Sequence, residues 1–519
     1  AETATSGTTD PSLDANWTAI SGTFPVQTGN ADKFLQTDGT NTLWTAVSAS
    51  PTLEAIASGA LANGDKVVIN ADGTVSVVSA TTTISTDLGT TADFVLATVA
   101  NISSVYDPVN KKVVIAYRDG SNSNYCTAIV GTVSGNTISF GSSTVFEAST
   151  CNKTAMTYDS VNNKVIVAFI TQSNQLAVVV GTVSGTSISF GSVVVAYSGS
   201  AGGPAITYDS GNQKLFLAYT DGSSSDFRGR VGTVSGTSTS WSGATVIDAA
   251  LCNHASVTYD PNAGKTAVFY HDNSNFRMLA RVVTISGTSF SYGTDLNVID
   301  NEVSYISSAF DSTNNKIIVA YKDNGNSNYG TARVATISGT TISVGTATVF
   351  ESGSMDYTSV AYDPQFERVA IGYRDVGDSF KGKLVVGTVS GTSISFDAPV
   401  LVKNGNSPYV SVTYIPDESN FVYSYWNVDG NDGESRPFSV GSLAKNLTDS
   451  NYIGISDAAY LDTETAVIQI NGSVDDAQSG LTAGQKYYVQ NNNTLSTTPD
   501  SPSVYAGLAV SATKLIVKG

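Results

Sequence analysis

The residues of this chain best suited to chemistry are five regularly spaced aspartates. Each lies just after a short apolar run and 12 residues beyond the Asp of an aromatic-Asp pair: Asp119, Asp221, Asp272, Asp323 and Asp375. With the Ser- and Asn-rich loops that follow, such carboxylates could bind a glycan or a cation. The alternative is that each carboxylate caps its own loop by accepting backbone N–H groups. Repetition in five places favours capping, because a binding site usually breaks the symmetry of a repeat.

Two histidines, His254 and His271, are weaker candidates. His271 is followed by Asp272, a pair that could assist proton transfer, but no serine or cysteine nucleophile motif accompanies it. Two histidines without a suitably spaced third ligand also make a weak zinc site. We therefore expect no enzyme, no metal and no cofactor, although paired carboxylates for glycoside cleavage stay an alternative. We expect buried thiols and no disulfide framework at the three cysteines, Cys126, Cys151 and Cys252.

A sequence unit that occurs seven times must position these residues. Its marker is an aromatic residue followed by Asp, degenerate in the last unit: Tyr106, Tyr158, Tyr208, Tyr259, Phe310, Tyr362 and Tyr414. Successive markers are 52, 50, 51, 51, 52 and 52 residues apart. A turn, an apolar run, a third run ending in Ser-Gly and a fourth, alternating run follow the marker. Four strands in a repeat of this length are typical of propeller blades. The sequence predicts an all-β protein with a seven-bladed β-propeller of four-stranded blades.

The seventh unit is incomplete, because it lacks the Ser-Gly turn and the fourth run. Ahead of the first unit, Phe94 lies 12 residues before Tyr106, just as Phe146 lies 12 residues before Tyr158. We predict that the segment from Asp93 to Ala97 completes the seventh blade. Closing the ring would remove exposed strand edges, whereas an open solenoid, the alternative, would keep them.

The segments that flank the repeats echo each other. Residues 61–76 share five identities with residues 481–496 at a constant offset of 420, and both stretches predict a hairpin. Because an isolated hairpin is barely stable, we expect the two to share a sheet in one small β domain, with the propeller inserted. The predicted domains are an N-terminal assembly arm (1–53), the two halves of the split β domain (54–87 and 446–519) and the propeller (88–445).

Charge and hydropathy argue against nucleic acid and membrane as partners. The formal net charge is −18, from 44 acidic and 26 basic residues, which argues against nucleic-acid binding. No apolar run of 18 residues occurs, so we expect no membrane insertion. Trp17 and Trp44 lie in an arm with too few apolar residues for a core of its own. We predict that both tryptophans contact a partner in an assembly.

The flanking segments resemble proteins of tailed phages. The stretch from Lys33 to Trp44 is similar to a sequence common in tail-fibre proteins, and residues 480–490, 494–497 and 512–517 resemble terminal domains of phage structural proteins. The resemblance implies a fibre, appendage or decoration subunit on the virion surface. Its ends would contact other virion proteins or copies of the same chain, and its propeller would contact a host-surface glycan. The alternatives are a purely structural subunit of a capsid or extracellular filament, and a polysaccharide-degrading enzyme.

Overall fold

A computed structural model describes residues 33–37, 42–46 and 51–518 of the chain. Within these residues every regular element is a strand, and no helix could cross a membrane. The chain divides into two compact units. Residues 83–442 form the repeat domain, and the segments up to residue 82 and from residue 443 belong to the split domain. The domain boundaries thus lie a few residues before the predicted ones at 87/88 and 445/446.

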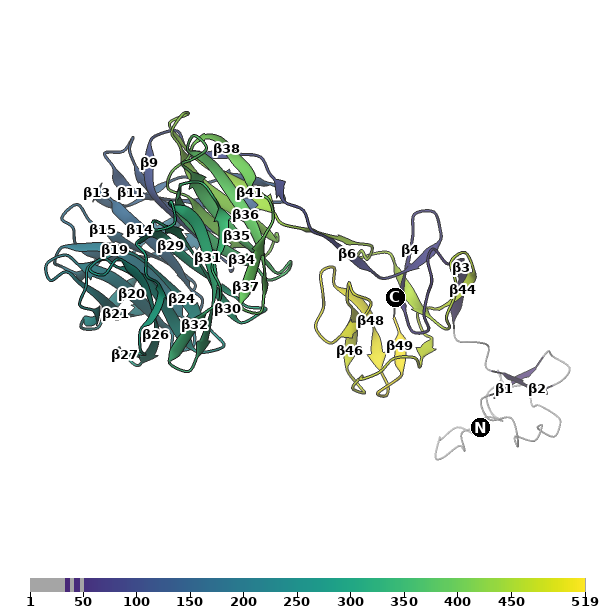
Figure 1. Ribbon diagram of the computed structural model, residues 1–519. Helices are drawn as coiled ribbons and strands as arrows, with labels where there is room; N and C mark the ends of the chain where they lie inside the picture. Colours follow the sequence, from purple (N-terminus) through teal and green to yellow (C-terminus); the bar gives the residue numbers. More distant parts are fainter. Residues whose placement is uncertain (1–32, 38–41, 47–50, 519) are drawn as a thin grey trace. The chain divides into compact units, whose positions relative to one another are not determined.

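The repeat domain contains seven sheets, one for each sequence unit (Figure 1). The first strand of each unit forms one edge of its sheet: β9 (Val99–Asp107), β14 (Asn152–Asp159), β19 (Ala201–Asp209), β24 (Cys252–Asp260), β29 (Val303–Asp311), β34 (Met355–Asp363) and β39 (Ser411–Ile415). First strands of successive units contact one another, and β39 also contacts β9. These edges are the inner edges of the seven sheets.

The apolar runs form the second strands: β10 (Lys112–Asp119), β15 (Lys164–Ile170), β20 (Lys214–Asp221), β25 (Lys265–Asp272), β30 (Lys316–Asp323), β35 (Arg368–Asp375) and β40 (Asn420–Asn427). The third strands are β11 (Tyr125–Ser134), β16 (Leu176–Ser184), β21 (Asp226–Ser235), β26 (Arg277–Ser286), β31 (Tyr329–Ser338), β36 (Lys381–Ser390) and β41 (Asp432–Ser439). Pairing is antiparallel throughout. The second strands are buried on both faces, as their continuous apolar character predicts.

The predicted fourth strand is broken into two short strands, which pair with different halves of the third. The first pieces are β12 (Thr137–Phe140), β17 (Ser187–Phe190), β22 (Ser238–Trp241), β27 (Ser289–Tyr292), β32 (Thr341–Val344) and β37 (Ser393–Phe396). The second pieces are β13 (Thr144–Thr150), β18 (Val194–Tyr197), β23 (Thr245–Asp248), β28 (Leu296–Ile299), β33 (Thr348–Glu351) and β38 (Val400–Asn406). Gly141 lies at the break between β12 and β13, where any Cβ would collide with the carbonyl oxygen of Thr186 in the next unit. Each sheet therefore has five strands, and its two short outer strands both pair with the third strand.

The seventh sheet is completed by chain that precedes the first unit. β7 (Asp87–Leu88) pairs with one end of β41, and β8 (Ala92–Val95) pairs with the other. The prediction for the segment around Asp93 is therefore confirmed. Phe94 packs on Tyr117 and Phe140 of the first unit, with ring centroids 5.1 and 5.9 Å away. Phe146 packs in the same way on Phe169 and Phe190 of the second unit.

The marker residues join neighbouring units. Asp107 is buried, and its Oδ1 accepts hydrogen bonds from the backbone N–H groups of Val109 and Asn110 in the following turn. The same oxygen accepts a hydrogen bond of 3.0 Å from the hydroxyl of Tyr158 in the next unit. Between the last and first units, the Tyr106 hydroxyl donates to Asp417. Ser104 Oγ also lies 2.7 Å from Ser411 Oγ. The seventh unit thus contacts the first much as other neighbours contact each other.

The split domain contains two sheets with one topology. The first has the order β3-β44-β43-β4-β5 and the second β45-β49-β48-β46-β47. The strands of the first sheet are β3 (Thr52–Ile56), β4 (Lys66–Ile69), β5 (Val75–Val77), β43 (Tyr452–Ser456) and β44 (Thr465–Gln469). Those of the second are β45 (Val474–Asp475), β46 (Lys486–Val489), β47 (Leu495–Ser496), β48 (Val504–Ala509) and β49 (Leu515–Val517). Strand for strand, the second sheet repeats the first in chain order.

Matching pairs of residues establish this duplication. Lys66 lies opposite Ile455 in the first sheet, and Lys486 lies opposite Leu508 in the second. Equivalent residues of the two copies differ in number by 420 when the first lies before the repeat domain (486 − 66) and by 53 when it lies after it (508 − 455). The repeat domain is therefore inserted in the connection between β5 and β43. The predicted shared sheet is wrong, because each hairpin pairs within its own copy; the copies instead share one apolar cluster that includes Val68, Ile455 and Tyr487.

The N-terminal boundary also differs from the prediction. β3 begins at Thr52 and pairs with β44, so the predicted arm boundary at 53/54 cuts through a strand of the split domain. Ahead of it, β1 (Lys33–Thr37) and β2 (Thr42–Ala46) form a hairpin in which Trp44 lies opposite Leu35. Trp17 lies outside the described residues. β6 (Ala80–Thr83) pairs with β42 (Ser442–Lys445) as a separate two-stranded sheet.

Candidate functional site

The five predicted aspartates are loop caps. Their side chains belong to residues that are only 1 to 6% exposed. Asp272 Oδ1 accepts hydrogen bonds from the backbone N–H groups of Ser274 and Asn275, at 3.0 and 3.2 Å. The corresponding bonds go from Ser121 to Asp119, from Ser223 to Asp221, from Asn326 to Asp323 and from Asp378 to Asp375. The five carboxylates thus cap their own loops, which is the simpler of the two alternatives. Contact of these loops with a ligand stays a prediction.

Three of the caps also form ion pairs. Asp221 pairs with Arg228, Asp272 with Arg277, and Asp375 with Lys383, at 3.2, 3.0 and 2.6 Å. Burial alone would raise the pKa of Asp272, but hydrogen bonds from Asn275 and Arg277 hold that pKa below its ordinary value. This carboxylate is also unavailable as a partner for His271 in catalysis. The three cysteines are buried free thiols, as predicted.

The feature that breaks the repeat lies on the inner strands. In six units the pairing between the first and second strands shifts register near the start of the first strand, as a β-bulge does. The displaced position lies five residues before the marker aromatic: Asn101, Lys153, Gly203, His254, Tyr305, Tyr357 and, in the seventh unit, Tyr409. Six of these residues have φ between 48° and 59°. Five of the six are not glycine, so their left-handed backbone carries strain of a kind found at binding sites.

Four of these residues are aromatic and consecutive, and we call them the aromatic arc: His254, Tyr305, Tyr357 and Tyr409. Their ring centroids are 5.3, 5.0 and 5.0 Å apart in that order. Each comes from a different unit, Tyr409 just before β39, and all four are half-buried. Trp426 of β40 extends the arc, stacked on Tyr409 with a centroid distance of 6.4 Å. The inner edges of four neighbouring sheets thus present a continuous row of aromatic faces.

Cations border the arc from the second strands. Lys322 Nζ lies 5.9 Å from the ring centroid of Tyr305, and Arg374 Cζ lies 4.9 Å from that of Tyr357. Both cations are the penultimate residue of their strand, the same repeat position as Trp426. Two hydrogen bonds of 2.7 Å fix the Arg374 guanidinium to Asp356. Cation–π contacts of this kind hold the rings in place.

The displaced positions of the first three units are not aromatic. They carry the amide of Asn101, the ammonium of Lys153 and no side chain at Gly203. Lys153 is exposed, and Asn101 is partly tied down by donating to the carbonyl oxygen of Cys151 at 3.2 Å. Apolar faces on one side and a few polar groups on the other are the usual composition of a small-molecule site.

His254 acts as an aromatic surface at neutral pH. Burial lowers the pKa of its imidazole to about 4, and the nearby Lys153, His271 and Lys322 act in the same direction. His271 is itself buried, and neither ring nitrogen has a hydrogen-bond partner within the described part of the chain. We therefore assign no catalytic role to either histidine.

Acidification should destabilise the protein partly through His254. Its pKa is about 4 when folded and near 6.5 when unfolded, so the unfolded chain takes up the proton first as the pH falls. The stability that comes from the neutral imidazole is present above pH 6.5 and is lost between pH 6.5 and pH 4. Urea unfolding at pH 7 and pH 4.5 should show a smaller loss in His254→Phe, which keeps a ring but cannot titrate. Equal losses in both proteins would contradict the assignment.

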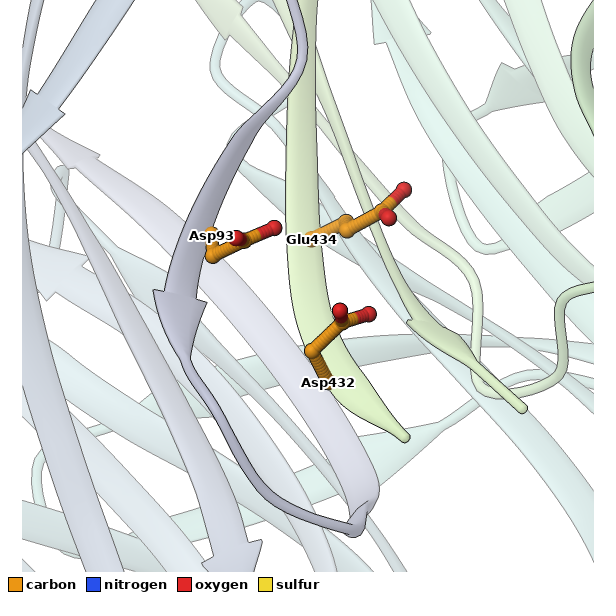
Figure 2. A group of neighbouring side chains, drawn as sticks. All are labelled: Asp93, Asp432 and Glu434. Carbon is orange, nitrogen blue, oxygen red and sulfur yellow. The ribbon is translucent and has the colours of Figure 1, made fainter. Parts of the chain in front are cut away.

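Three carboxylates meet at the seam of the seventh sheet (Figure 2). Asp93 comes from β8, and Asp432 and Glu434 come from β41, with ligand atoms within 4.8 Å of one another. Glu434 accepts hydrogen bonds from Asn427 at 2.7 Å and from Lys403 of β38 at 3.2 Å. Burial and the neighbouring carboxylate of Glu434 raise the pKa of Asp432. Because Glu434 already has several partners, we interpret the cluster as a junction between strands.

Sequence reasoning found the loop aspartates but missed the arc. The signal was present: four aromatic residues occupy the same position relative to the marker in successive units. The markers themselves are also aromatic, and the sequence does not show that the displaced residues leave the regular strand. That information comes from the bulges and the positive φ angles.

Neither a protein-family model nor a curated protein sequence matches the chain. Among solved structures, the BP39L lectin from Burkholderia pseudomallei is similar, with a TM-score of 0.51 and 11% identity over 68% of this chain and 99% of the lectin. A chain of the mitotic checkpoint complex has a TM-score of 0.44 and 10% identity, covering 68% of this chain and 94% of that one. Sqt1 from Chaetomium thermophilum has a TM-score of 0.41 and 12% identity, covering 66% and 89%. At such identities the likeness concerns the fold alone: this is an all-β protein with a β-propeller.

Proposed function

We propose that this protein is an attachment subunit of a tailed-phage virion, in which the repeat domain binds a saccharide on the host surface. The observation that carries the proposal is the aromatic arc, a site that interrupts an otherwise regular repeat at its inner edge. The split domain and the N-terminal segment, with Trp17 and Trp44, would join the subunit to other virion proteins or to further copies. The resemblance of these flanking segments to phage structural proteins supports that part.

In this proposal the repeat domain is a closed seven-bladed propeller. Contacts between the seventh and first units support closure, among them the Tyr106–Asp417 hydrogen bond and the packing of Phe94 on Tyr117. The ring of seven displaced residues would then surround the central axis at one end. The arc would occupy about half of that opening and the polar residues the rest.

A saccharide is the ligand class that fits such an opening best. The C–H groups on one face of a pyranose ring form an apolar surface that packs on the negative face of an aromatic ring. Three tyrosines at centroid spacings of 5.0 Å offer several such faces in a row. Hydroxyl groups at the edges of the sugar need donors and acceptors, which Asn101 and Lys153 supply across the ring.

The proposal excludes turnover of the bound saccharide. Glycoside hydrolysis needs two suitably spaced carboxyl groups with different protonation states. Beside the arc, Asp356 is held by Arg374, and the five loop aspartates are bound to their own backbone. These arrangements support binding without cleavage.

Substitution of Tyr357 tests this function. The full chain should bind one or more polysaccharides on an array of bacterial surface glycans, and Tyr357→Ala should weaken that binding by about tenfold or more, equivalent to ~1.4 kcal/mol. Tyr357→Phe should retain most of the affinity, because it keeps the aromatic face. Tyr292→Ala, at a tyrosine on the outer strand β27 that is 40% exposed, is the control and should bind like the wild type.

Two results would contradict the proposal. Equal affinities of wild type and Tyr357→Ala for every bound glycan would remove the arc from binding. Release of new reducing ends from a bound polysaccharide would replace the attachment role with an enzymatic one.

A further inference from the structure

Basic residues gather around the aromatic arc although they are scarce in the chain. The protein has 26 basic and 44 acidic residues. Four of the basic residues occupy two positions of the repeat, namely the displaced position of the first strand and the penultimate position of the second strand. Lys153 lies at the displaced position of its inner strand, and Arg118, Lys322 and Arg374 are the penultimate residues of their second strands. No acidic residue occupies either position in any of the seven units.

Three of these four cations have no acidic partner among the residues that the structure describes. Arg374 is neutralised by Asp356, with N–O distances of 2.7 Å. For Arg118, Lys153 and Lys322, no carboxylate of the described residues lies within the 4.0 Å of an ion pair. Lys153 is exposed, and Arg118 and Lys322 are half-buried. Glu302, an exposed acidic residue in the loop just before β29, lies outside these two repeat positions.

A positively charged site on an acidic protein requires an explanation. Because the chain carries a net charge of −18, its overall field repels anions. Unpaired cations reverse that field locally, and the half-buried positions of Arg118 and Lys322 weaken the screening of their charges by solvent. A neutral sugar would use these cations only as hydrogen-bond donors, whereas an anionic sugar would also gain from their charge.

We propose that the arc selects saccharides that carry anionic groups, either carboxylate or sulfate. This inference rests on the proposed function and adds the chemical class of the ligand. The sugar ring stacks on the tyrosines, and its acidic substituent is recognised by the ammonium groups of Lys322 and Lys153. Arg374 is a positioning residue, because its charge is already balanced and its guanidinium supports the ring of Tyr357.

Matched pairs of glycans test the inference. Each glycan that the full chain binds on the array is compared, by titration calorimetry, with its carboxyl-reduced or desulfated counterpart. We expect the neutral counterpart to bind at least about tenfold more weakly. Carboxyl reduction and desulfation as separate arms show which anion the site takes. Bound glycans that are neutral, or counterparts that bind equally well, would overturn the inference.

A charge-matched pair of double variants completes the test. Lys153→Gln with Lys322→Gln should lose the preference for the acidic glycan over its neutral counterpart, measured as the ratio of the two affinities. The control is Lys265→Gln with Lys316→Gln, which removes the same charge at the opposite ends of β25 and β30. This control should keep the preference. If the first double variant keeps it too, the inference fails while the proposed function stands; if Tyr357→Ala has no effect on any glycan, the proposed function itself fails.

Discussion

Replacing residues 87–95 by a glycine-serine linker of equal length is expected to lower the melting temperature of the repeat domain by at least about 10 °C. The change removes β7 and β8, which form the outer edge of the seventh sheet. It also removes Phe94, which is 5% exposed. Loss of a buried phenylalanine alone costs about 3–5 kcal/mol, and the loss of two paired strands adds to it. Scanning calorimetry of the full chain measures the shift.

Single substitutions provide the matched control for this replacement. Phe94→Ala and Phe350→Ala remove equivalent rings, because Phe350 packs on Tyr373 and Phe396 as Phe94 packs on Tyr117 and Phe140. If the last sheet is joined to the first as the others are joined, the two variants should lose similar stability. A loss for Phe94→Ala below a third of that for Phe350→Ala would show that the ring does not depend on this seam.

Removing residues 80–445 should yield two folded proteins from one. Ser79 and Asn446 are hydrogen-bonded to each other, through Ser79 N to Asn446 Oδ1 at 2.7 Å and Asn446 N to Ser79 O at 3.1 Å. A two-residue Asn-Gly turn can therefore join them, as in a tight hairpin. The shortened chain should unfold cooperatively, and the excised residues 83–442 should fold separately. Dispersed amide resonances in both products would be the evidence.

Deletion within the second copy is the counterpart of that experiment. Removing residues 474–517 takes Tyr487, Val489 and Leu515 from the apolar cluster that the two copies share. The remaining copy would expose its half of the cluster, so the split domain should lose cooperative unfolding while the repeat domain keeps it. A split domain that still unfolds cooperatively after this deletion would show that one copy is stable alone.

The architecture was predictable where sequence signals repeat. The marker pair fixed the number of units, because Asp107 and its equivalents cap a turn that every complete unit needs. The missing end of the last unit, together with the position of Phe94, located the strand that completes it. Burial of the second strands followed from their apolar runs. Each of these signals reflects a local physical need that recurs in every unit.

What could not be predicted depends on irregular backbone and on distant pairing. Tyr305 and Tyr357 of the arc are displaced by bulges, which leave no mark in composition. The second copy in the split domain was hidden because β45 and β47 contain only two residues each, and because the offset between copies changes from 420 to 53 across the insertion. Loop capping by the aspartates was foreseeable as the simpler of two hypotheses.

The path of the chain through the seventh sheet determines how tension passes between the domains. The incoming chain enters the repeat domain through β7, and the outgoing chain leaves it from β41. Asp87 at the start of β7 lies opposite Ser439 at the end of β41, so both connections depart side by side from one end of one sheet. A load that reaches the repeat domain through these connections would therefore be divided between two covalent strands of one sheet. The double tether also resists torque, since the repeat domain cannot spin freely about two connections as it could about one.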